Sequence, residues 1–479
     1  MATGVETGRI TTNIPARLDR LPWARWHWLV VIGLGTVWIL DGLEVTIVGS
    51  MSEALKPAST GLGMTNFDIG LAGAVYVAGA CLGALVFGQL TDRFGRKKLF
   101  IITLVLYTIA TVLTAFSMNP MWYFVCRFFT GAGIGGEYAA INSAIDELIP
   151  KDYRGRVDVV INGSFWIGAA AGALLTLPLL DPTLVNPAYG WRIAFGLGAV
   201  LAIGVLLVRR HVPESPRWLF IHGREEEAEK VVDGIEEKIT ADGHDLAEAE
   251  ETITIHQRRS IGMGLIAKTV FASYPKRTVV CFALFVGQAF LYNAFFFTYG
   301  DTLTTFLGVK QTGGFIAVFA VSNFLGALLL SKLFDTVGRR PMIAGTYLLS
   351  GVLLAITGLI LGNLTAVTLT AAGAVIFFFA SAGASSAYLT VSEIFPMETR
   401  AMCIAFFYAI GTAAGGIAGP LLFGALIQNA SGSGDITKIA IGYYIGAALM
   451  IIGGVIQAIF GVKAERQSLE DIAKPLTAA

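Results

Sequence analysis

The chain carries the same short charged pattern twice, and each copy directly follows a long apolar stretch. The first copy starts at Asp92 and reads D-R-F-G-R-K, and the second starts 243 residues later at Asp335 and reads D-T-V-G-R-R. A pattern of glutamate, proline and arginine recurs at nearly the same offset: Glu147, Pro150 and Arg154, then Glu393, Pro396 and Arg400. Repeats that flank apolar segments in this way predict two related half-bundles of membrane helices, the plan of one large class of transporters.

Composition also places the chain in a membrane. Hydrophobic residues make up 55% of the sequence and charged residues only 14%, whereas an ordinary globular domain carries about 25% charged residues. The formal net charge is zero, which argues against nucleic acid as a partner. No phosphate-binding loop, nucleophile–base pair or metal-ligand spacing occurs, so we expect neither an enzyme nor a cofactor, and ATP does not supply the energy.

Twelve segments have the length of about 20 mainly apolar residues that crosses the hydrocarbon core of a bilayer. The first six cover residues 28–50, 67–90, 99–118, 121–145, 157–180 and 190–208. After a long polar interval, the other six cover residues 277–300, 313–334, 341–361, 365–388, 401–427 and 439–461. The predicted fold class is an all-α membrane protein with twelve transmembrane helices in two pseudo-symmetric six-helix bundles.

Lysine and arginine predict the side of the membrane that each loop occupies. With both termini inside, the outer segments receive only Lys56, Arg192, Lys310 and Lys438. We therefore expect a plasma (inner) membrane protein with cytoplasmic termini and without a removable signal peptide. The expected parts are a tail (1–27), a bundle (28–208), a helical cytoplasmic linker (209–276), a second bundle (277–462) and a tail (463–479). Within the linker, helices are predicted over 225–238 and 246–256.

The chain resembles the major facilitator superfamily over residues 28–462. The D-R-x-G-R-[KR] pattern after the second span is a signature of that superfamily. Arg127 within R-x-x-x-G-x-G and the run P-E-S-P-R-W that begins at Pro213 are similar to its sugar-porter-like branch. The resemblance implies the major facilitator fold and a functional monomer that works by alternating access.

The sequence departs from the hexose carriers of that branch at two places. Of the polar set usual in the seventh span, only Gln288 and Asn293 remain, and the tenth span lacks the usual proline–tryptophan segment. The run D-G-L-E that begins at Asp41 instead resembles the D-G-x-D pattern of aromatic-acid and related metabolite:proton symporters. The run G-G-E-Y that ends at Tyr138 points the same way.

Ionisable groups at bilayer depth cost at least ~2.5–3.5 kcal/mol, so they are functional candidates. Glu44 lies six residues from the outer end of the first span, and Arg127 lies six residues from the outer end of the antiparallel fourth span. Asp41 lies one helical turn deeper than Glu44 on the same helix face. We expect Asp41 and Glu44 to form the proton site with Arg127 as a switchable counter-ion, and the resemblance implies the same partnership. The alternative is a static ion pair that only holds two helices together.

Glu137 lies deeper in the fourth span, nearer the cytoplasmic side. We expect it to join the charge network on that side, and the alternative is that it binds the substrate. The glycines that precede it are expected to let helices approach closely, because small residues have that effect in membranes. They are Gly131, Gly133, Gly135 and Gly136.

Charged residues and glycines at the cytoplasmic ends of the spans form a predicted inner gate. Asp92 and Asp335 are expected to lie at the starts of the eleventh and fifth spans, because a helix N-terminus favours a carboxylate by about 0.3–1 kcal/mol. The resemblance implies that such contacts close the inner side in the outward-open state. The predicted gate comprises Asp92, Gly95, Arg96, Glu147, Arg154, Glu214, Arg217, Asp335, Gly338, Arg339, Glu393 and Arg400.

The substrate is expected in a midplane cavity between the bundles. Its predicted lining is polar and aromatic: Trp38, Asn162, Trp166, Gln288, Tyr292, Asn293, Tyr388 and Tyr408. The predicted function is proton-coupled symport of a small carboxylate or aromatic metabolite, driven by the proton gradient, with the solute, protons and the lipid bilayer as partners. A sugar or polyol porter of the same fold is the nearest alternative, and a non-transporting nutrient sensor is a remote one.

Overall fold

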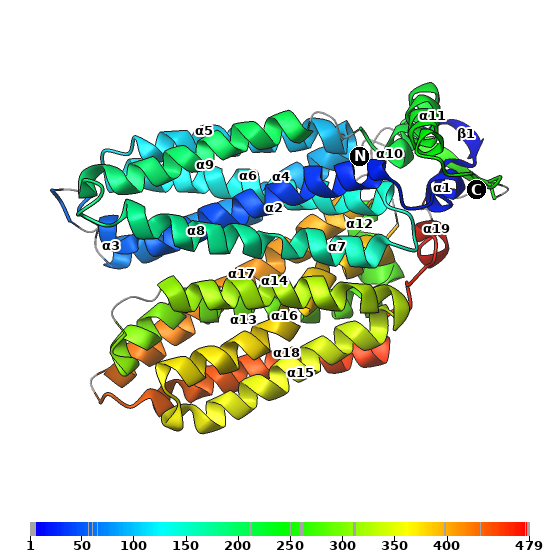
Figure 1. Cartoon of the computed structure of the whole chain (residues 1–479). Helices are drawn as coiled ribbons and strands as arrows, with labels where there is room; N and C mark the ends of the chain where they lie inside the picture. Colours follow the sequence, from blue (N-terminus) through cyan, green and yellow to red (C-terminus); the bar gives the residue numbers. More distant parts are fainter. Residues whose placement is uncertain are drawn as a thin grey trace.

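Long apolar helices run side by side along the whole molecule (Figure 1). The computed structural model describes residues 6–55, 57–59, 61–64, 66–209, 213–249, 251–258, 263–309, 313–396, 399–431, 433–474 and 476. Within these ranges, eleven helical segments are long and apolar enough to cross a membrane. One more helix, α6 (Pro120–Leu148), is equally long but carries Arg127 and Glu137. The twelve-helix prediction is therefore confirmed.

The first half of the chain supplies the upper bundle of Figure 1, in blue to green. Its helices are α2 (Arg25–Ser50), α4 (Asn66–Phe94), α5 (Arg96–Ala115), α6, α7 (Arg154–Gly163), α8 (Phe165–Leu179) and α9 (Pro187–Arg209). The helices α7 and α8 follow one another as a single span. A short helix, α3 (Ser52–Leu55), follows α2.

The second half supplies the lower bundle, in yellow-green to red. Its helices are α13 (Pro275–Leu307), α14 (Gly313–Thr336), α15 (Arg339–Ile360), α16 (Ala366–Ile394), α17 (Arg400–Ser431) and α18 (Ala440–Phe460), with the short turns η2 (Leu361–Asn363) and η4 (Ile436–Ile439). Between the bundles, α17 packs on α4 and α6, and α14 packs on α7 and α8.

Glycine allows the closest helix contacts, as the sequence predicts for α6. A Cβ atom on Gly135 would lie 2.0 Å from the carbonyl oxygen of Ala80 on α4, and one on Gly131 would lie 2.1 Å from that of Tyr76. The two bundles also meet through small residues, because a Cβ atom on Gly88 of α4 would lie 2.4 Å from that of Ala405 on α17. Small side chains thus permit backbone approach both within and between the bundles.

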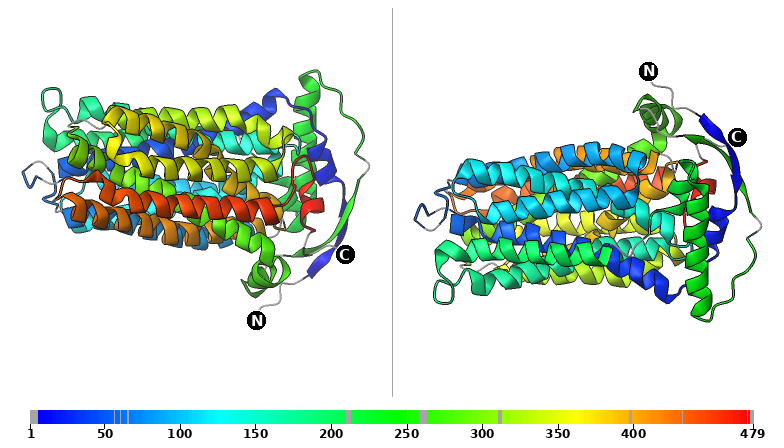
Figure 2. Two further views of the ribbon diagram at one scale, coloured as in Figure 1. Left: turned by 90° about the horizontal axis from the view of Figure 1, so that it is seen from below. Right: turned by 90° about the horizontal axis from the view of Figure 1, so that it is seen from above.

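Both termini lie at one end of the bundle, called here the terminal end, and the opposite end is the far end (Figures 1 and 2). The terminal end carries short elements: β1 (Glu6–Thr12), α1 (Ile14–Asp19), α10 (Pro216–Ile221), α11 (Glu225–Ala241), β2 (Ile253–Arg258), α12 (Met263–Lys268), η1 (Thr269–Ser273) and α19 (Leu469–Ile472). The helix predicted over 225–238 is present as α11.

The helix predicted over 246–256 is wrong. Residues 253–258 form β2, which pairs antiparallel with β1, so that Ile10 lies opposite Ile255 and Thr12 opposite Ile253. The residues I-T-I at 253–255 are all β-branched, and such residues suit a strand when a partner strand is present. The partner comes from the N-terminal segment, which local patterns in the linker do not reveal. In the residues that the structure describes, this two-stranded sheet is the only β structure beside the helices.

Candidate functional site

A buried ion pair joins α2 to α6. Arg127 Nη1 donates a hydrogen bond of 2.7 Å to Glu44 Oε1, and both side chains are only 2% exposed. The other oxygen of Glu44 accepts a bond of 3.3 Å from Thr111 Oγ1 on α5. The structure therefore joins the two residues whose matching depths the sequence indicates, and α5 holds the carboxylate from a third side.

Aromatic rings cover the guanidinium of Arg127. Its central carbon lies 4.7 Å from the centre of the Tyr76 ring and 5.9 Å from that of Phe195. Ring faces attract a cation, and this attraction is worth about 2 kcal/mol or more when water is excluded. Arg127 can thus remain charged in this apolar region while it faces Glu44.

Asp41 lies one turn of α2 before Glu44, but the structure does not pair it with Arg127. The side chain of Asp41 is fully buried, and neither of its carboxylate oxygens has a hydrogen-bond partner in the described part of the chain. Asp41 and Glu44 are close enough to interact electrostatically. Of the two predicted proton-site acids, Glu44 therefore has a counter-ion, and Asp41 has none among the residues that the structure describes.

Glu137 does not join the charge network at the terminal end, so that prediction is wrong. Its side chain is fully buried, both of its carboxylate oxygens lack a hydrogen-bond partner within the described ranges, and it interacts electrostatically with Asp41 and Glu44. Position along a helix predicts depth but not the direction in which a side chain points. The structure thus brings three carboxyl groups together: Asp41, Glu44 and Glu137.

Aromatic side chains from both bundles meet next to these acids and form an aromatic cluster of Trp38, Tyr138, Tyr388 and Tyr408. Trp38 on α2 stacks on Tyr138 of α6, with ring centres 4.4 Å apart and an interplanar angle of 5°. Tyr408 of α17 meets Tyr138 edge-on at 5.0 Å, and Tyr388 of α16 meets Trp38 edge-on at 5.8 Å. Tyr138 was not among the predicted substrate residues, although it ends the G-G-E-Y run that the sequence singles out.

Other predicted substrate residues form a second contact between the bundles. Trp166 of α8 stacks on Tyr292 of α13, with ring centres 5.4 Å apart. The hydroxyl of Tyr292 donates a bond of 2.7 Å to Asn323 Oδ1 of α14. This pair links α8, α13 and α14, and Phe165 of α8 connects it to the aromatic cluster, with ring centres 5.0 Å from Trp166 and 6.4 Å from Trp38.

The predicted amides take different places. Asn162 Nδ2 on α7 donates a bond of 3.0 Å to Asn142 Oδ1 on α6, and both side chains are buried. Asn293 Nδ2 donates to the carbonyl oxygen of Ala289 in its own helix at 2.8 Å. Gln288 is half-buried on the same helix, α13.

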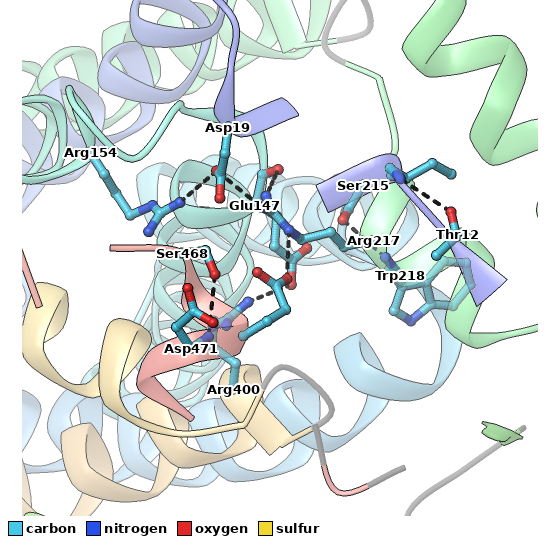
Figure 3. A network of polar contacts seen from close by, with 12 residues as sticks. Thr12, Asp19, Glu147, Arg154, Ser215, Arg217, Trp218, Arg400, Ser468 and Asp471 are labelled. Carbon is cyan, nitrogen blue, oxygen red and sulfur yellow. Dashed lines mark hydrogen bonds and ion pairs between the residues drawn. The ribbon is translucent and has the colours of Figure 1, made fainter. Parts of the chain in front are cut away.

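At the terminal end, Glu147 links the two bundles (Figure 3). It accepts a hydrogen bond of 2.9 Å from Arg96 Nη2 on α5 and one of 3.3 Å from Arg400 Nη1 on α17, and all three side chains are buried. Breaking a buried pair of this kind by removing one partner costs about 3–5 kcal/mol. The contact therefore holds the terminal end closed.

Asp335 makes a second link between the bundles at the same end. Its two carboxylate oxygens accept hydrogen bonds from the backbone N–H groups of Gly155 at 3.1 Å and Arg156 at 2.9 Å, at the start of α7. Arg339 holds the acid by a bond of 2.7 Å to Asp335 Oδ1, and bonds to Glu393 at 2.8 and 2.9 Å. The helix N-terminus attracts this carboxylate, as the sequence analysis expects. The side chain of its counterpart, Asp92, lies outside the described residues.

Asp19, from the N-terminal segment, was missed by the sequence analysis, which treated residues 1–27 as a tail. It accepts hydrogen bonds from Arg154 Nη2 at 3.2 Å and Arg217 Nη2 at 3.1 Å (Figure 3). Arg217 also bonds to Glu470 of α19 at 3.1 Å. Burial opposes the charge of Arg217, but the carboxylates of Glu470 and Asp19 outweigh burial and raise the pKa of Arg217. No local pattern marks Asp19, because its partners are far away in the chain.

The repeated glycines have the same role in both bundles. Gly95 and Gly338 adopt φ values of 102° and 113°, which favour glycine, directly before α5 and α15. Glu214 accepts the backbone N–H of Arg96 at 2.9 Å. Glu465, which the sequence analysis missed, accepts that of Arg339 at 3.3 Å. Each repeated motif is thus capped by a glutamate that follows the last helix of its own bundle.

The surroundings of Glu214 act on its pKa in two opposite directions. Burial raises the pKa of the Glu214 carboxyl, while the N–H groups of Ser215, Arg96 and Lys97 and the charge of Arg96 oppose that rise. Burial outweighs these interactions, so the pKa of Glu214 lies above its ordinary value.

Comparison with known proteins gives consistent results. A family model described as sugar (and other) transporter matches residues 30–475. The niacin transporter NiaP of Acinetobacter baylyi is 30% identical over 425 residues, covering 86% of this chain and 89% of that protein. The 4-hydroxybenzoate transporter PcaK of the same organism is 26% identical over 420 residues, covering 85% and 86%. The solved structure of the major facilitator superfamily proton:xylose symporter XylE bound to 6-bromo-6-deoxy-D-glucose gives a TM-score of 0.76 at 17% identity, covering 93% of this chain and 98% of that chain.

Proposed function

The chain belongs to the sugar (and other) transporter family, and we propose that it carries a small carboxylate or aromatic metabolite across the membrane together with protons. The family model and the relatives identify the chain as a multi-pass membrane transporter of the major facilitator superfamily and not as an enzyme. We further propose that it works as a monomer in the plasma membrane, with the terminal end on the cytoplasmic side.

The buried pair of Glu44 and Arg127, with Asp41 one turn away, is the observation that carries this proposal. A carboxylate inside the membrane is costly unless a cation or a proton neutralises it. When Arg127 faces Glu44, the acid needs no proton. A rearrangement that separates them makes Glu44 bind a proton, and this exchange of counter-ions couples the proton gradient to the conformational change.

The contacts at the terminal end support alternating access. Glu147 with Arg400, and Asp335 with the start of α7, join the two bundles there. Opening of the terminal end requires both contacts to break, so this conformation corresponds to the state in which the cytoplasmic side is closed. Closing of the far end then compensates for the lost contacts.

The aromatic cluster supports a flat or ring-shaped solute. Trp38, Tyr138, Tyr388 and Tyr408 come from four helices of both bundles, so a solute bound there contacts the two bodies that must move. Two relatives are named a niacin transporter and a 4-hydroxybenzoate transporter, and both of these solutes are small aromatic acids. The description of the family also names sugars, which therefore belong in the same assay.

Uptake into proteoliposomes with an imposed pH gradient tests the proposal. The panel consists of radiolabelled nicotinate, 4-hydroxybenzoate, a short-chain carboxylate and a hexose. We expect an aromatic acid to accumulate when the outside is acidic, and the Glu44→Gln and Asp41→Asn variants to lose accumulation while they retain counterflow exchange. The Asp181→Asn variant, which changes an acid in the loop after α8, serves as the control. Accumulation that persists in both acid variants would contradict the coupling, and accumulation of the hexose alone would select the sugar porter.

A further inference from the structure

The charges at the centre of the first bundle do not balance. Three carboxyl groups are gathered there from α2 and α6: Asp41, Glu44 and Glu137. Arg127 is hydrogen-bonded to Glu44, so its charge balances that acid. Asp41 and Glu137 are both fully buried, and none of their four carboxylate oxygens has a hydrogen-bond partner among the described residues. Two positive charges are missing if both of these acids are ionised.

The groups around Asp41 and Glu137 do not supply those charges. The helices packed around them present acids and tyrosines: Glu44 on α2, Tyr76 on α4, Tyr107 on α5, Tyr138 on α6, Asp158 on α7, Tyr388 on α16 and Tyr408 on α17, besides Arg127, which faces Glu44. Tyrosine hydroxyls are neutral at physiological pH. The part of the chain that the structure describes thus supplies no counter-charge to the two acids.

An unpaired buried carboxylate is too costly to remain ionised, and such a group takes up a proton instead. Here that argument applies twice, to one acid on each of two neighbouring helices. It does not apply to Glu44, which has a counter-ion. The site therefore binds more protons than the pair of Glu44 and Arg127 alone requires.

We propose that Glu137 binds a second proton beside the one that Asp41 and Glu44 share, that each transport cycle carries both protons with the solute, and that the shared proton must load for the cycle to proceed. This inference rests on the proposed function, because it deepens the same coupling site. On the loading side, one O–H bond forms on Glu137 and one on whichever acid of Asp41 and Glu44 does not face Arg127. Both bonds break on the release side, where entering water hydrates the ionised acids and accepts the protons.

The position of the two acids also connects the protons to the solute. Trp38 lies one helical turn from Asp41, and Tyr138 directly follows Glu137 in the chain, while Trp38 and Tyr138 stack on each other. A ring bound against this stack covers the same part of α2 and α6 that carries both acids. Binding of the solute therefore controls access of water to both protons.

Infrared spectroscopy of the purified protein tests the proton content without any substrate. The carbonyl stretch of a protonated carboxyl group is separate from the carboxylate bands and shifts in heavy water. We expect two such bands from buried groups, of which Asp41→Asn removes one and Glu137→Gln the other. The Asp181→Asn variant should leave both. A single band, or a spectrum unchanged by Glu137→Gln, would overturn the inference.

Transport gives the second measurement. With the membrane potential clamped at zero, each proton contributes about a tenfold accumulation for each pH unit of gradient, since one unit corresponds to a factor of ten in equilibrium. Using radiolabelled nicotinate and 4-hydroxybenzoate as probes, we expect roughly 100-fold accumulation per unit in the native protein and roughly tenfold in Glu137→Gln. Tenfold accumulation in both would refute the second proton and leave the proposed function intact. Uptake that ignores the pH gradient while both infrared bands remain would instead refute the proposed coupling.

Discussion

Arg400 of α17 donates a hydrogen bond of 3.3 Å to Glu147 of α6, and so connects the second bundle to the first at the terminal end. The same carboxylate accepts a hydrogen bond from Arg96, the first residue of α5. Arg96 belongs to the first charged repeat and Arg400 to the second glutamate–proline–arginine pattern. Residues of the two repeated patterns therefore bind the same carboxylate, that of Glu147. The strength of these hydrogen bonds sets how readily the bundles separate at the terminal end.

Loss of the charge of Glu147 should open the terminal end. In Glu147→Gln, the buried arginines lose their shared carboxylate, which costs about 3–5 kcal/mol in comparable buried pairs. We expect faster labelling of a reporter cysteine at Ala401, a position that is buried in the closed state, in a background without native cysteines. Glu227→Gln removes an exposed pair with Arg224 and is the control. Equal labelling rates in the two variants would argue against this gate.

Asp19 should tie the N-terminal segment to the gate. In Asp19→Asn, Arg154 and Arg217 lose their common carboxylate, and we expect a lower melting temperature in detergent and faster proteolysis of the N-terminal segment. Asp233→Asn removes an acid that also bonds to this segment, through Arg17, but is 65% exposed. Since exposed pairs contribute only about 0–1 kcal/mol, that control should behave almost like the native protein. An unchanged melting temperature in Asp19→Asn would contradict the assignment.

Docking of α1 on α11 should weaken in acid. Arg17 donates hydrogen bonds of 3.0 and 2.5 Å to Glu236. Burial raises the pKa of Glu236, but the bonds from Arg17 and Arg20 outweigh burial and lower it. Because the folded-state pKa lies below the unfolded value, the stabilisation is complete above the ordinary glutamate pKa of about 4.3 and is lost as the pH falls through the folded value.

Energy transfer between dyes attached at Thr11 and Ala241 measures this docking. We expect the transfer to fall only below about pH 4.3 in the native protein. Glu236→Gln should reduce it already at neutral pH, and Glu226→Gln, which changes an exposed acid of the same helix, should not. Transfer that is constant from neutral pH to pH 3 would rule out this contribution.

Gly135→Ala should destabilise the first bundle. The added Cβ atom would lie 2.0 Å from the carbonyl oxygen of Ala80, so α4 and α6 must move apart, and overpacking typically costs about 1–3 kcal/mol. Gly204→Ala is the matched control, because Gly204 lies in α9 with nothing within 4 Å of the added atom. Replacement of that helical glycine should gain up to about 1 kcal/mol. Thermal unfolding in detergent distinguishes the two, and equal melting temperatures would contradict the close packing.

Trp38→Leu should weaken binding of aromatic acids. The change removes the stacked partner of Tyr138, and an aromatic pair is worth about 0.5–1.5 kcal/mol beyond its buried area, so KM should rise roughly 2–10-fold. Trp28→Leu changes a tryptophan of the same helix that is 55% exposed, and should leave KM unchanged. Initial rates of nicotinate and 4-hydroxybenzoate uptake give both values. A KM that rises equally in both variants would place the solute elsewhere.

Properties that run along the chain were predictable. The length of apolar segments predicts the twelve spans, and the two copies of the charged motif predict two related bundles. Matching depths also predict that Glu44 and Arg127 meet, because antiparallel helices bring equal depths side by side. These features depend on distance along a helix, which the sequence states directly.

Contacts that depend on rotation or on distant segments were not predictable in this way. Glu137 turns toward Asp41, and no one-dimensional measure of depth indicates that direction. The linker segment at 253–258 forms a strand because β1 lies beside it. Asp19 bonds to Arg217 across 198 residues of sequence. In each case the partner that decides the structure comes from elsewhere in the chain.

The ties of Arg217 to both ends of the chain have a consequence for biogenesis. Its two acidic partners, Asp19 and Glu470, lie 198 and 253 residues away, on opposite sides of it in the sequence. At about 5–20 residues per second, ribosomes need roughly 13–50 s to synthesise the stretch from Arg217 to Glu470. During that interval the newly inserted first bundle has only one of the two acidic partners of Arg217, namely Asp19. Insertion of the carrier therefore includes a period in which a chaperone at the membrane surface can act. This period ends when α19, which carries Glu470, has been synthesised.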